Sequence, residues 1–158
     1  MTWEPQRPVY RSELPFEASR IQAAAVYCSD GRFGEHIDDF LHNALRLPRY
    51  DRLSIPGGAA CLAGHFPSFR EEYALMAQLR FLLTVHELRR VVLIAHRDCA
   101  YYAEGLHVRA ERQFQQQVDD LVQAAHRIRS LSSGLEVDAY FASRTEEGVD
   151  FHVVGEVD

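Results

Sequence analysis

The sequence predicts an α/β fold: a mostly parallel central sheet flanked by helices, with an edge strand at the C-terminus. Two observations indicate this class. Short apolar runs typical of buried strands alternate with longer amphipathic segments that have helical spacing. Two final strand-like runs follow each other across a short turn, with no helix between them. Parallel strands joined by helices require right-handed crossovers, which place helices on the faces of the sheet.

The first half of the chain contains two predicted strands and one predicted helix. Ala23–Tyr27 consists of small and apolar residues, as expected for a buried strand. Glu35–Leu47 carries apolar residues at helical spacing, and Pro48 ends that helix. Arg52–Ile55 is a second short strand, because the turn Pro56-Gly57-Gly58 stops it.

The second half continues the alternation of strands and helices. Ser68–Leu88 is a long predicted helix, with Ser68 as its N-cap and Glu71 completing a capping box. Arg89–His96 is a short and largely apolar strand. Gln113–Leu131 is a further amphipathic helix, which a Ser-Ser-Gly turn ends.

The C-terminal part contains the last two predicted strands. Glu136–Ser143 and Val149–Val154 alternate in hydrophobicity on either side of a turn, which predicts an antiparallel pair at the edge of the sheet. No linker or internal repeat divides the chain. We therefore expect a single domain over residues 1–158, in which residues 1–20 form an N-terminal arm.

Composition narrows the class of protein. Hydrophobic residues make up 47% of the 158 residues, enough for a substantial core. The formal net charge is −6 and arginines are interspersed with acidic residues, so we expect no nucleic-acid partner. No apolar run approaches the roughly 20 residues of a membrane span and no signal peptide is visible, which favours a cytoplasmic location without a membrane partner. Three cysteines are too few for a disulfide framework and are expected as thiols or metal ligands.

Side chains that can bind a metal follow two of the predicted strands. Cys28, Asp30 and Arg32 occupy alternate positions after the first strand. His96 ends the third predicted strand, and Cys99 follows it. In an open parallel sheet, sites form at the carboxyl ends of the strands, so these side chains are expected to meet. Thiolate and imidazole ligands favour Zn²⁺. The alternative is that each is an ordinary buried residue, since free cysteine behaves as a small hydrophobe.

Two motifs resemble those of the β-class carbonic anhydrases. The segment Cys28-Ser29-Asp30-Gly31-Arg32 is similar to the Cys-x-Asp-x-Arg motif of that family, and His96-Arg97-Asp98-Cys99 is similar to its His-x-x-Cys. Their order, their positions after strands and the Gly57-Gly58 turn between them also agree with the family. The resemblance implies a β-carbonic anhydrase-like fold and assembly into homodimers or larger homo-oligomers.

The resemblance also implies roles for individual residues. Cys28, His96 and Cys99 are the implied metal ligands, Zn²⁺ is the implied cofactor, and no residues are expected to bind another cofactor. Asp30 and Arg32 form an implied dyad, in which Asp30 orients a zinc-bound hydroxide and Arg32 holds the carboxylate by charge-assisted hydrogen bonds. In the resting form of the family the same aspartate can bind zinc, so Asp30 is also a candidate switch. The implied reaction is the reversible hydration of CO₂ to bicarbonate, and CO₂ and bicarbonate are the expected small-molecule partners.

The sequence departs from the family pattern near the expected substrate pocket. Ala100 follows the second cysteine where the family usually has glycine, and Gly57-Gly58 lies in PGGAA where the family usually has Gly-Asn. Gln6 and Gln22 are candidates for a glutamine that the family often places near the substrate. Two alternatives stay open: hydrolysis of carbonyl sulfide or carbon disulfide at the same site, and a catalytically weak zinc protein with a regulatory or assembly role.

Other chemically active residues have simpler interpretations. Cys61 is interpreted as a core residue, and the alternative is a third thiolate that closes the metal site. His36, His42, His65 and His86 are expected at the surface, with a proton shuttle as the alternative role. His65, beside the Gly-rich turn, is the strongest of the four candidates for that role.

Overall fold

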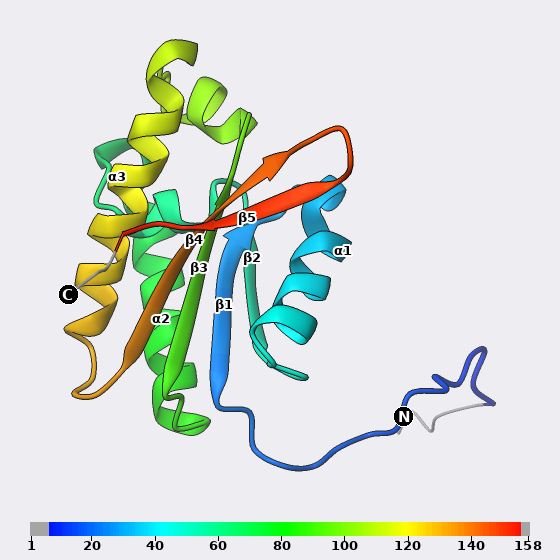
Figure 1. Ribbon diagram of the computed structural model, residues 1–158. Helices are drawn as coiled ribbons and strands as arrows, with labels where there is room; N and C mark the ends of the chain where they lie inside the picture. The colour runs from blue at the N-terminus through cyan, green and yellow to red at the C-terminus, as the bar shows by residue number, and fades with distance from the viewer. Residues whose placement is uncertain (1–6, 156–158) are drawn as a thin grey trace.

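A five-stranded sheet forms the centre of the structure. The computed structural model describes residues 7–155. Its strands are β1 (Ala23–Cys28), β2 (Asp51–Ile55), β3 (Arg90–His96), β4 (Glu136–Arg144) and β5 (Val149–Val153). They lie in the order β2-β1-β3-β4-β5 (Figure 1). All neighbouring strands pair in parallel except β4 and β5, which are antiparallel at the edge.

Helices cover both faces of this sheet. The helical elements are α1 (Gly31–Asp39), the π-helical η1 (Phe40–Ala44), the 3-10 turns η2 (Gly58–Leu62) and η3 (Phe66–Ser68), α2 (Phe69–Val85), the π-helical η4 (Tyr101–Gly105) and α3 (Ala110–Arg129). Figure 1 shows α1 on one side of the sheet and α2 and α3 on the other. The predicted fold class is therefore confirmed.

Alternation along the buried strands explains why two helical layers are needed. In β1, Ala24 and Val26 join the core formed with α2 and α3, whereas Ala25 and Tyr27 join the core formed with α1. Successive side chains of a strand point to opposite faces, so an entirely apolar strand must be covered on both sides. Leu79 of α2 is fully buried in the first of these cores. Burial of one such side chain contributes roughly 1.5–3 kcal/mol.

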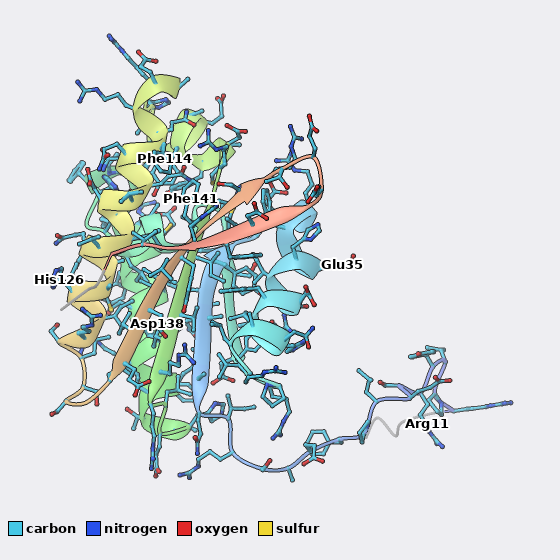
Figure 2. The ribbon with its side chains drawn as sticks, in the orientation of Figure 1. Arg11, Glu35, Phe114, His126, Asp138 and Phe141 are labelled. Carbon is cyan, nitrogen blue, oxygen red and sulfur yellow. The ribbon has the colours of Figure 1, made fainter. Side chains whose placement is uncertain are left out.

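Helix α3 is fixed at the carboxyl ends of β3 and β4. The ring of Phe114 on α3 stands edge-on to Phe141 on β4, with 5.0 Å between the ring centroids (Figure 2). Phe141 pairs across the sheet with Ala95, the residue before His96. The packing of α3 is therefore tied to the end of β3 that carries His96.

Helix α1 begins earlier than the sequence predicts. It starts at Gly31 and not at Glu35. The reason is a cap, because Asp30 accepts a hydrogen bond from the backbone N–H of Arg32 (3.0 Å) through its side chain. With η1, the helical segment ends at Ala44, three residues before the predicted end.

The capping box predicted at Ser68 is wrong. Helix α2 does begin at Phe69, directly after Ser68, but the Ser68 side chain makes no capping hydrogen bond. Its hydroxyl donates instead to the carbonyl oxygen of His65 (3.1 Å), because η3 places that carbonyl within reach.

The described part of the N-terminal arm, residues 7–20, runs away from the sheet (Figure 1). It carries four exposed large apolar side chains, Val9, Tyr10, Leu14 and Phe16. Its last residues contact the body through Arg49, which donates to the carbonyl oxygens of Glu17 and Ser19. Within residues 7–155, no helix combines the length and apolar character that crossing a membrane requires.

Candidate metal centre

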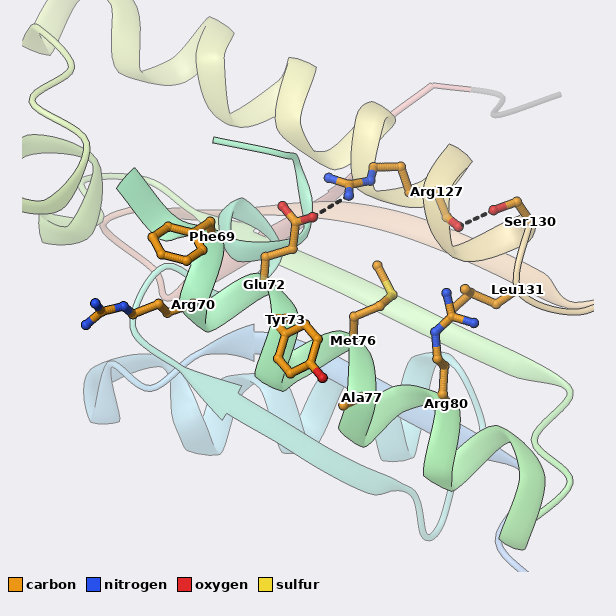
Figure 3. A pocket seen from close by; sticks show the side chains of 10 residues that line it. All are labelled: Phe69, Arg70, Glu72, Tyr73, Met76, Ala77, Arg80, Arg127, Ser130 and Leu131. Carbon is orange, nitrogen blue, oxygen red and sulfur yellow. Dashed lines mark hydrogen bonds and ion pairs between the residues drawn. The ribbon is translucent and has the colours of Figure 1, made fainter. Parts of the chain in front are cut away.

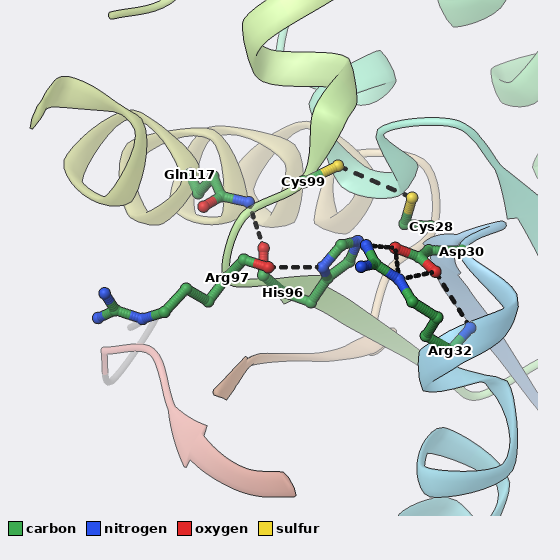
Figure 4. A network of polar contacts seen from close by, with 7 residues as sticks. All are labelled: Cys28, Asp30, Arg32, His96, Arg97, Cys99 and Gln117. Atoms are coloured by element: carbon green, nitrogen blue, oxygen red, sulfur yellow. Dashed lines mark hydrogen bonds and ion pairs between the residues drawn. The ribbon is translucent and has the colours of Figure 1, made fainter. Parts of the chain in front are cut away.

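Two neighbouring strands end at the candidate site. Cys28 is the last residue of β1 and His96 is the last residue of β3, and these strands pair in parallel. Cys99 follows three residues after His96. All three residues are buried, and their sulfur and nitrogen atoms lie within 4.8 Å of one another (Figure 4). The structure thus brings together the three residues that the sequence singled out, and the group can hold a metal ion.

One ring nitrogen of His96 is buried and makes no hydrogen bond to any of the residues that the structure describes. Its Nδ1 lies 2.9 Å from the carbonyl oxygen of Arg97, and a carbonyl only accepts, so Nδ1 carries the hydrogen and Nε2 keeps a lone pair. Phe33 packs against the ring at 4.3 Å between centroids. Within residues 7–155, the buried Nε2 has no hydrogen-bond partner. Since buried polar atoms nearly always have partners, Nε2 is suited to bind a group from outside the chain.

The two cysteines of the group interact directly. Their sulfur atoms lie 3.7 Å apart, and both residues are free cysteines. The Cys99 thiol donates to the Cys28 sulfur, which lowers the pKa of Cys28 to about 4, although burial acts in the opposite direction. The same contact, together with burial, raises the pKa of Cys99 above its usual range. Thiolate and imidazole donors of this kind fit Zn²⁺ better than Mg²⁺ or Ca²⁺, which prefer oxygen.

Gly58, the first residue of η2, packs against the backbone at the end of β1, where Cys28 lies. Gly58 has φ +50°, and a Cβ atom there would lie 2.6 Å from the carbonyl carbon of Tyr27 and 2.7 Å from the backbone nitrogen of Cys28. Only glycine allows this close approach of two backbones. The Gly-Gly turn that separates the two motifs in the sequence therefore packs directly against the first of them.

Asp30 and Arg32 form an ion pair at the edge of the group. The guanidinium donates through Nη2 to Oδ2 (2.6 Å) and through Nε to Oδ1 (3.0 Å), as a fork on the carboxylate (Figure 4). This pairing lowers the pKa of Asp30 to about 2. The carboxylate caps α1 and binds Arg32, and it lies outside the group that Cys28, His96 and Cys99 form.

The sequence matches a family model described as "Putative carbonic anhydrase" over residues 18–154. The chain belongs to this carbonic anhydrase family. The match covers both motifs and every strand of the sheet. The family resemblance drawn from the two motifs is therefore confirmed.

Solved β-carbonic anhydrases share the fold of this carbonic anhydrase family member. Isoform I from Trichomonas vaginalis is 14% identical, with a TM-score of 0.58, and the match covers 90% of this chain and 89% of that chain. CafD from Aspergillus fumigatus is 13% identical, with a TM-score of 0.51 and coverage of 88% and 93%. At these identities the likeness shows the fold alone. A comparison with curated proteins found no match.

Cys61 lies in the core and not in the ligand group. It is fully buried beside α2 and α3, and its thiol donates to the carbonyl oxygen of Pro56 (3.4 Å). Burial raises its pKa to about 11, which keeps it a thiol at neutral pH. Its position agrees with the interpretation of Cys61 as a packing residue.

The four histidines proposed as alternative proton shuttles occupy different surroundings. His65 Nε2 lies 2.8 Å from the carboxylate of Asp120. His86 pairs with Asp51 at the opposite end of the sheet, and His42 packs against a tyrosine ring. Among these four histidines, His36 is the one that lines the same cleft as Arg32.

Of the two candidate glutamines, Gln22 does not reach the group formed by Cys28, His96 and Cys99. Gln22 precedes β1, at the opposite end of the strand from Cys28, and its carbonyl accepts from the backbone of Arg89. Gln6 lies outside the described residues.

Sequence reasoning missed three residues near the site: Gln117, which donates to the backbone of His96, Tyr102, which packs in the same cluster as Cys99, and Asp120, which binds Tyr102. Gln117 and Asp120 of α3 are buried polar residues, and Asp120 accepts a hydrogen bond from Tyr102. Polar residues at helical spacing, Gln113, Gln117 and Asp120, share the face that also carries Leu121. This mixture of polar and apolar residues on one face could have indicated that Gln117 and Asp120 are buried.

Two hollows on the protein surface lie at different distances from the group formed by Cys28, His96 and Cys99. A cleft of about 360 Å³ lies beside the ion pair, lined by Arg32, Asp98 and the turn between β4 and β5. A larger groove of about 840 Å³ lies outside α2 and the end of α3, where Arg127 pairs with Glu72 (Figure 3). Of these two hollows, the smaller one borders the candidate site.

Proposed function

We propose that the protein is a zinc-dependent carbonic anhydrase that interconverts CO₂ and bicarbonate, with Cys28, His96 and Cys99 as metal ligands. One observation carries the proposal: two sulfur atoms lie within 4.8 Å of a buried imidazole nitrogen that has no hydrogen-bond partner in the described part of the chain, at the ends of adjacent strands. The carbonic anhydrase family supports the reaction class.

The donor set suits a catalytic zinc site. Catalytic zinc sites have three protein ligands and keep one position for water or substrate, whereas structural sites have four. When bound, zinc supplies the Lewis acidity that lets water react as a nucleophile near neutral pH. Two thiolates offset much of the metal's charge, so neighbouring residues must contribute more to orienting the nucleophile.

Asp30 and Arg32 are proposed to supply that contribution. Because Arg32 holds the pKa of Asp30 near 2, the carboxylate is ionised at neutral pH and only accepts hydrogen bonds. Asp30 accepts a hydrogen bond from the attacking oxygen and aims the oxygen lone pair at the carbon of CO₂. Arg32 fixes the carboxylate in this orientation through its two-pronged contact. The proton released by net hydration leaves to solvent.

A second substrate class has one structural feature in its favour. Cys28 and Cys99 share an apolar cluster with Ala60 and Tyr102, against which Leu106 packs. Apolar surroundings favour carbonyl sulfide or carbon disulfide, because both are less soluble in water than CO₂. Hydrolysis of such a sulfur analogue at the same metal centre is therefore the second candidate function.

We also propose that the chain assembles into a homodimer or larger homo-oligomer. The exposed arm side chains and the exposed Phe69, Tyr73 and Phe81 of α2 leave apolar surface that a second copy would bury. Light scattering of the purified chain measures the assembly. A mass equal to one chain at micromolar concentration contradicts this part of the proposal.

Stopped-flow mixing of the zinc-loaded protein with CO₂ and a pH indicator tests the proposed reaction. We expect the wild type and Cys61→Ser to accelerate acidification and Cys28→Ser to lose the acceleration. Cys61→Ser is the matched control, because it removes a buried thiol outside the ligand group. A zinc-loaded wild type that accelerates only carbonyl sulfide hydrolysis supports the second substrate class. A protein that holds zinc and accelerates neither reaction supports the regulatory or assembly role.

A further inference from the structure

Helix α3 contacts the segment that carries the proposed ligands through buried polar side chains. In the part of the chain that the structure describes, the buried polar or charged residues are Ser68, His96, Gln117 and Asp120. Two of these lie on α3, three positions apart, and therefore on one face of the helix. Glutamine and aspartate are rarely buried without a specific partner, so their partners indicate what they do.

Gln117 holds the backbone of His96. It is 2% exposed, and its Nε2 donates to the carbonyl oxygen of His96 at 2.7 Å (Figure 4). His96 is the last residue of β3, where the regular hydrogen bonding of the sheet stops. A buried carbonyl at this point needs a partner from outside the sheet. The Gln117 amide supplies this hydrogen bond and thereby fixes the position of His96, a proposed metal ligand.

Asp120 holds the segment on the other side of Cys99. It is 3% exposed, and Oδ2 accepts from the hydroxyl of Tyr102 at 2.7 Å and lies 2.8 Å from Nε2 of His65. Its Oδ1 accepts from Gln116 at 2.9 Å. The ring of Tyr102 packs in the same cluster as Cys99. Asp120 thus fixes the residue that packs behind the second thiolate ligand.

The turn between these two anchors has an unfavourable backbone conformation. Asp98 lies between His96 and Cys99 and has φ +58°. This left-handed region is uncommon for residues other than glycine, and residues held there depend on their surroundings. Gln117 binds the backbone just before the turn, and Asp120 binds Tyr102 just after it. The helix therefore holds both ends of the strained turn that connects two proposed ligands.

We propose that α3 positions the metal ligands through Gln117 and Asp120: the Gln117 amide fixes His96 through its carbonyl, and the Asp120 carboxylate fixes Cys99 through Tyr102. Both are positioning residues, because they act through other residues and not on the substrate. The inference rests on the proposed metal centre. Contacts of this kind behind metal ligands set ligand orientation, and their loss typically lowers metal affinity or activity by roughly 10–100-fold.

The variant Gln117→Met tests the proposal, because methionine keeps the length of the side chain and removes the donor. Gln113→Met is its matched control: Gln113 lies one turn earlier on the same helix and donates to the carbonyl of Val108 (3.0 Å), which belongs to no proposed ligand. We compare the zinc dissociation constant from chelator competition, the visible absorption bands of the Co²⁺-loaded protein, and the unfolding temperature of the metal-free protein.

We expect Gln117→Met to bind zinc roughly 10–100-fold more weakly and to shift the Co²⁺ bands, whereas Gln113→Met resembles the wild type in both. If the unfolding temperature falls equally in both variants, that fall reports a general loss of stability and not a change at the metal centre. Wild-type zinc affinity and Co²⁺ bands in Gln117→Met overturn the inference and leave the proposed function intact. A wild type that binds neither metal overturns the proposed function as well.

If Gln117→Met does not fold, Tyr102→Phe decides the question. Phenylalanine keeps the packing of the ring against Cys99 and removes the hydroxyl that binds Asp120. A weaker zinc affinity with shifted Co²⁺ bands supports the positioning role of α3. Unchanged affinity and bands overturn it.

Discussion

The sulfur atoms of Cys28 and Cys99 lie 3.7 Å apart although 71 positions separate the two residues in the sequence. The parallel pairing of β1 with β3 causes this approach, because Cys28 ends one strand and Cys99 follows shortly after the end of the other. His96, at the end of β3, adds a nitrogen with no partner among residues 7–155. A cation satisfies all three groups at once, since it stabilises both thiolates and accepts the nitrogen lone pair.

The first prediction concerns metal content. Purified protein is expected to hold about one zinc per chain, and Cys28→Ser, His96→Ala and Cys99→Ser are each expected to lose it, because removing one of three ligands leaves too few strong donors. Cys61→Ser is expected to keep the metal. Elemental analysis after dialysis against a weak chelator measures this. Full zinc retention in any two of the three ligand variants contradicts the proposed site.

The second prediction separates metal binding from catalysis. Arg32→Ala is expected to keep zinc and to lower the rate of CO₂ hydration by roughly 10–100-fold, because Arg32 orients Asp30 and binds no metal. Arg20→Ala is the control, because Arg20 pairs with Glu87 just before the start of β3, at the opposite end of that strand from His96. Stopped-flow rates and zinc content are measured on the same samples. An unchanged pH–rate profile in Arg32→Ala removes this residue from the mechanism.

Most of the fold and the ligand group were predictable because their causes are local. Ala23–Tyr27 and Arg89–His96 are apolar runs, and both differ from the observed strands by one residue. Apolar strands alternating with helices dictate a parallel sheet, and such a sheet gathers strand ends at one edge. The sequence alone therefore predicts that Cys28 and His96 lie close together.

The features that were missed depend on specific side-chain contacts, which the pattern of apolar residues does not reveal. The Gly-Arg-Phe-Gly start of α1 looks like a loop, and it is helical because Asp30 caps it and Phe33 is buried. Gln117 lies on the same face of its helix as Leu121, which indicates burial, but no pattern in the sequence identifies the carbonyl of His96 as its partner. Ser68 matched a capping pattern, but a neighbouring turn offered its hydroxyl a different acceptor.

The third prediction concerns acid stability away from the metal centre. Burial raises the pKa of Asp38, but hydrogen bonds from the Tyr50 hydroxyl and the Arg52 guanidinium outweigh burial, so its pKa is lowered in the folded protein. A lowered folded-state pKa contributes stability above the unfolded-state value of roughly 4, and this contribution is lost as the pH falls below it. Asp38→Asn is therefore expected to cost stability at pH 7 and progressively less towards pH 3.

Urea denaturation at several pH values checks this. Glu35→Gln, at an exposed position of the same helix, controls for the general effect of removing one negative charge. A loss of stability in Asp38→Asn that stays constant from pH 7 to pH 3 contradicts the assignment of the stabilisation to the ionised carboxylate.

The last prediction concerns Gly58, where the turn after β2 meets the backbone of Cys28. Gly58→Ala places a Cβ atom 2.6–2.7 Å from backbone atoms of Tyr27 and Cys28, at a positive φ that alanine adopts poorly. Backbone atoms of a central strand cannot move aside cheaply, so we expect a loss of more than about 1 kcal/mol in the free energy of unfolding, together with weaker zinc binding. Gly34→Ala is the matched control, because α1 leaves open space around it and alanine favours the helix by about 0.5–1 kcal/mol. Urea denaturation and chelator competition measure the two effects. Gly58→Ala with wild-type stability and zinc affinity would show that the turn does not support Cys28.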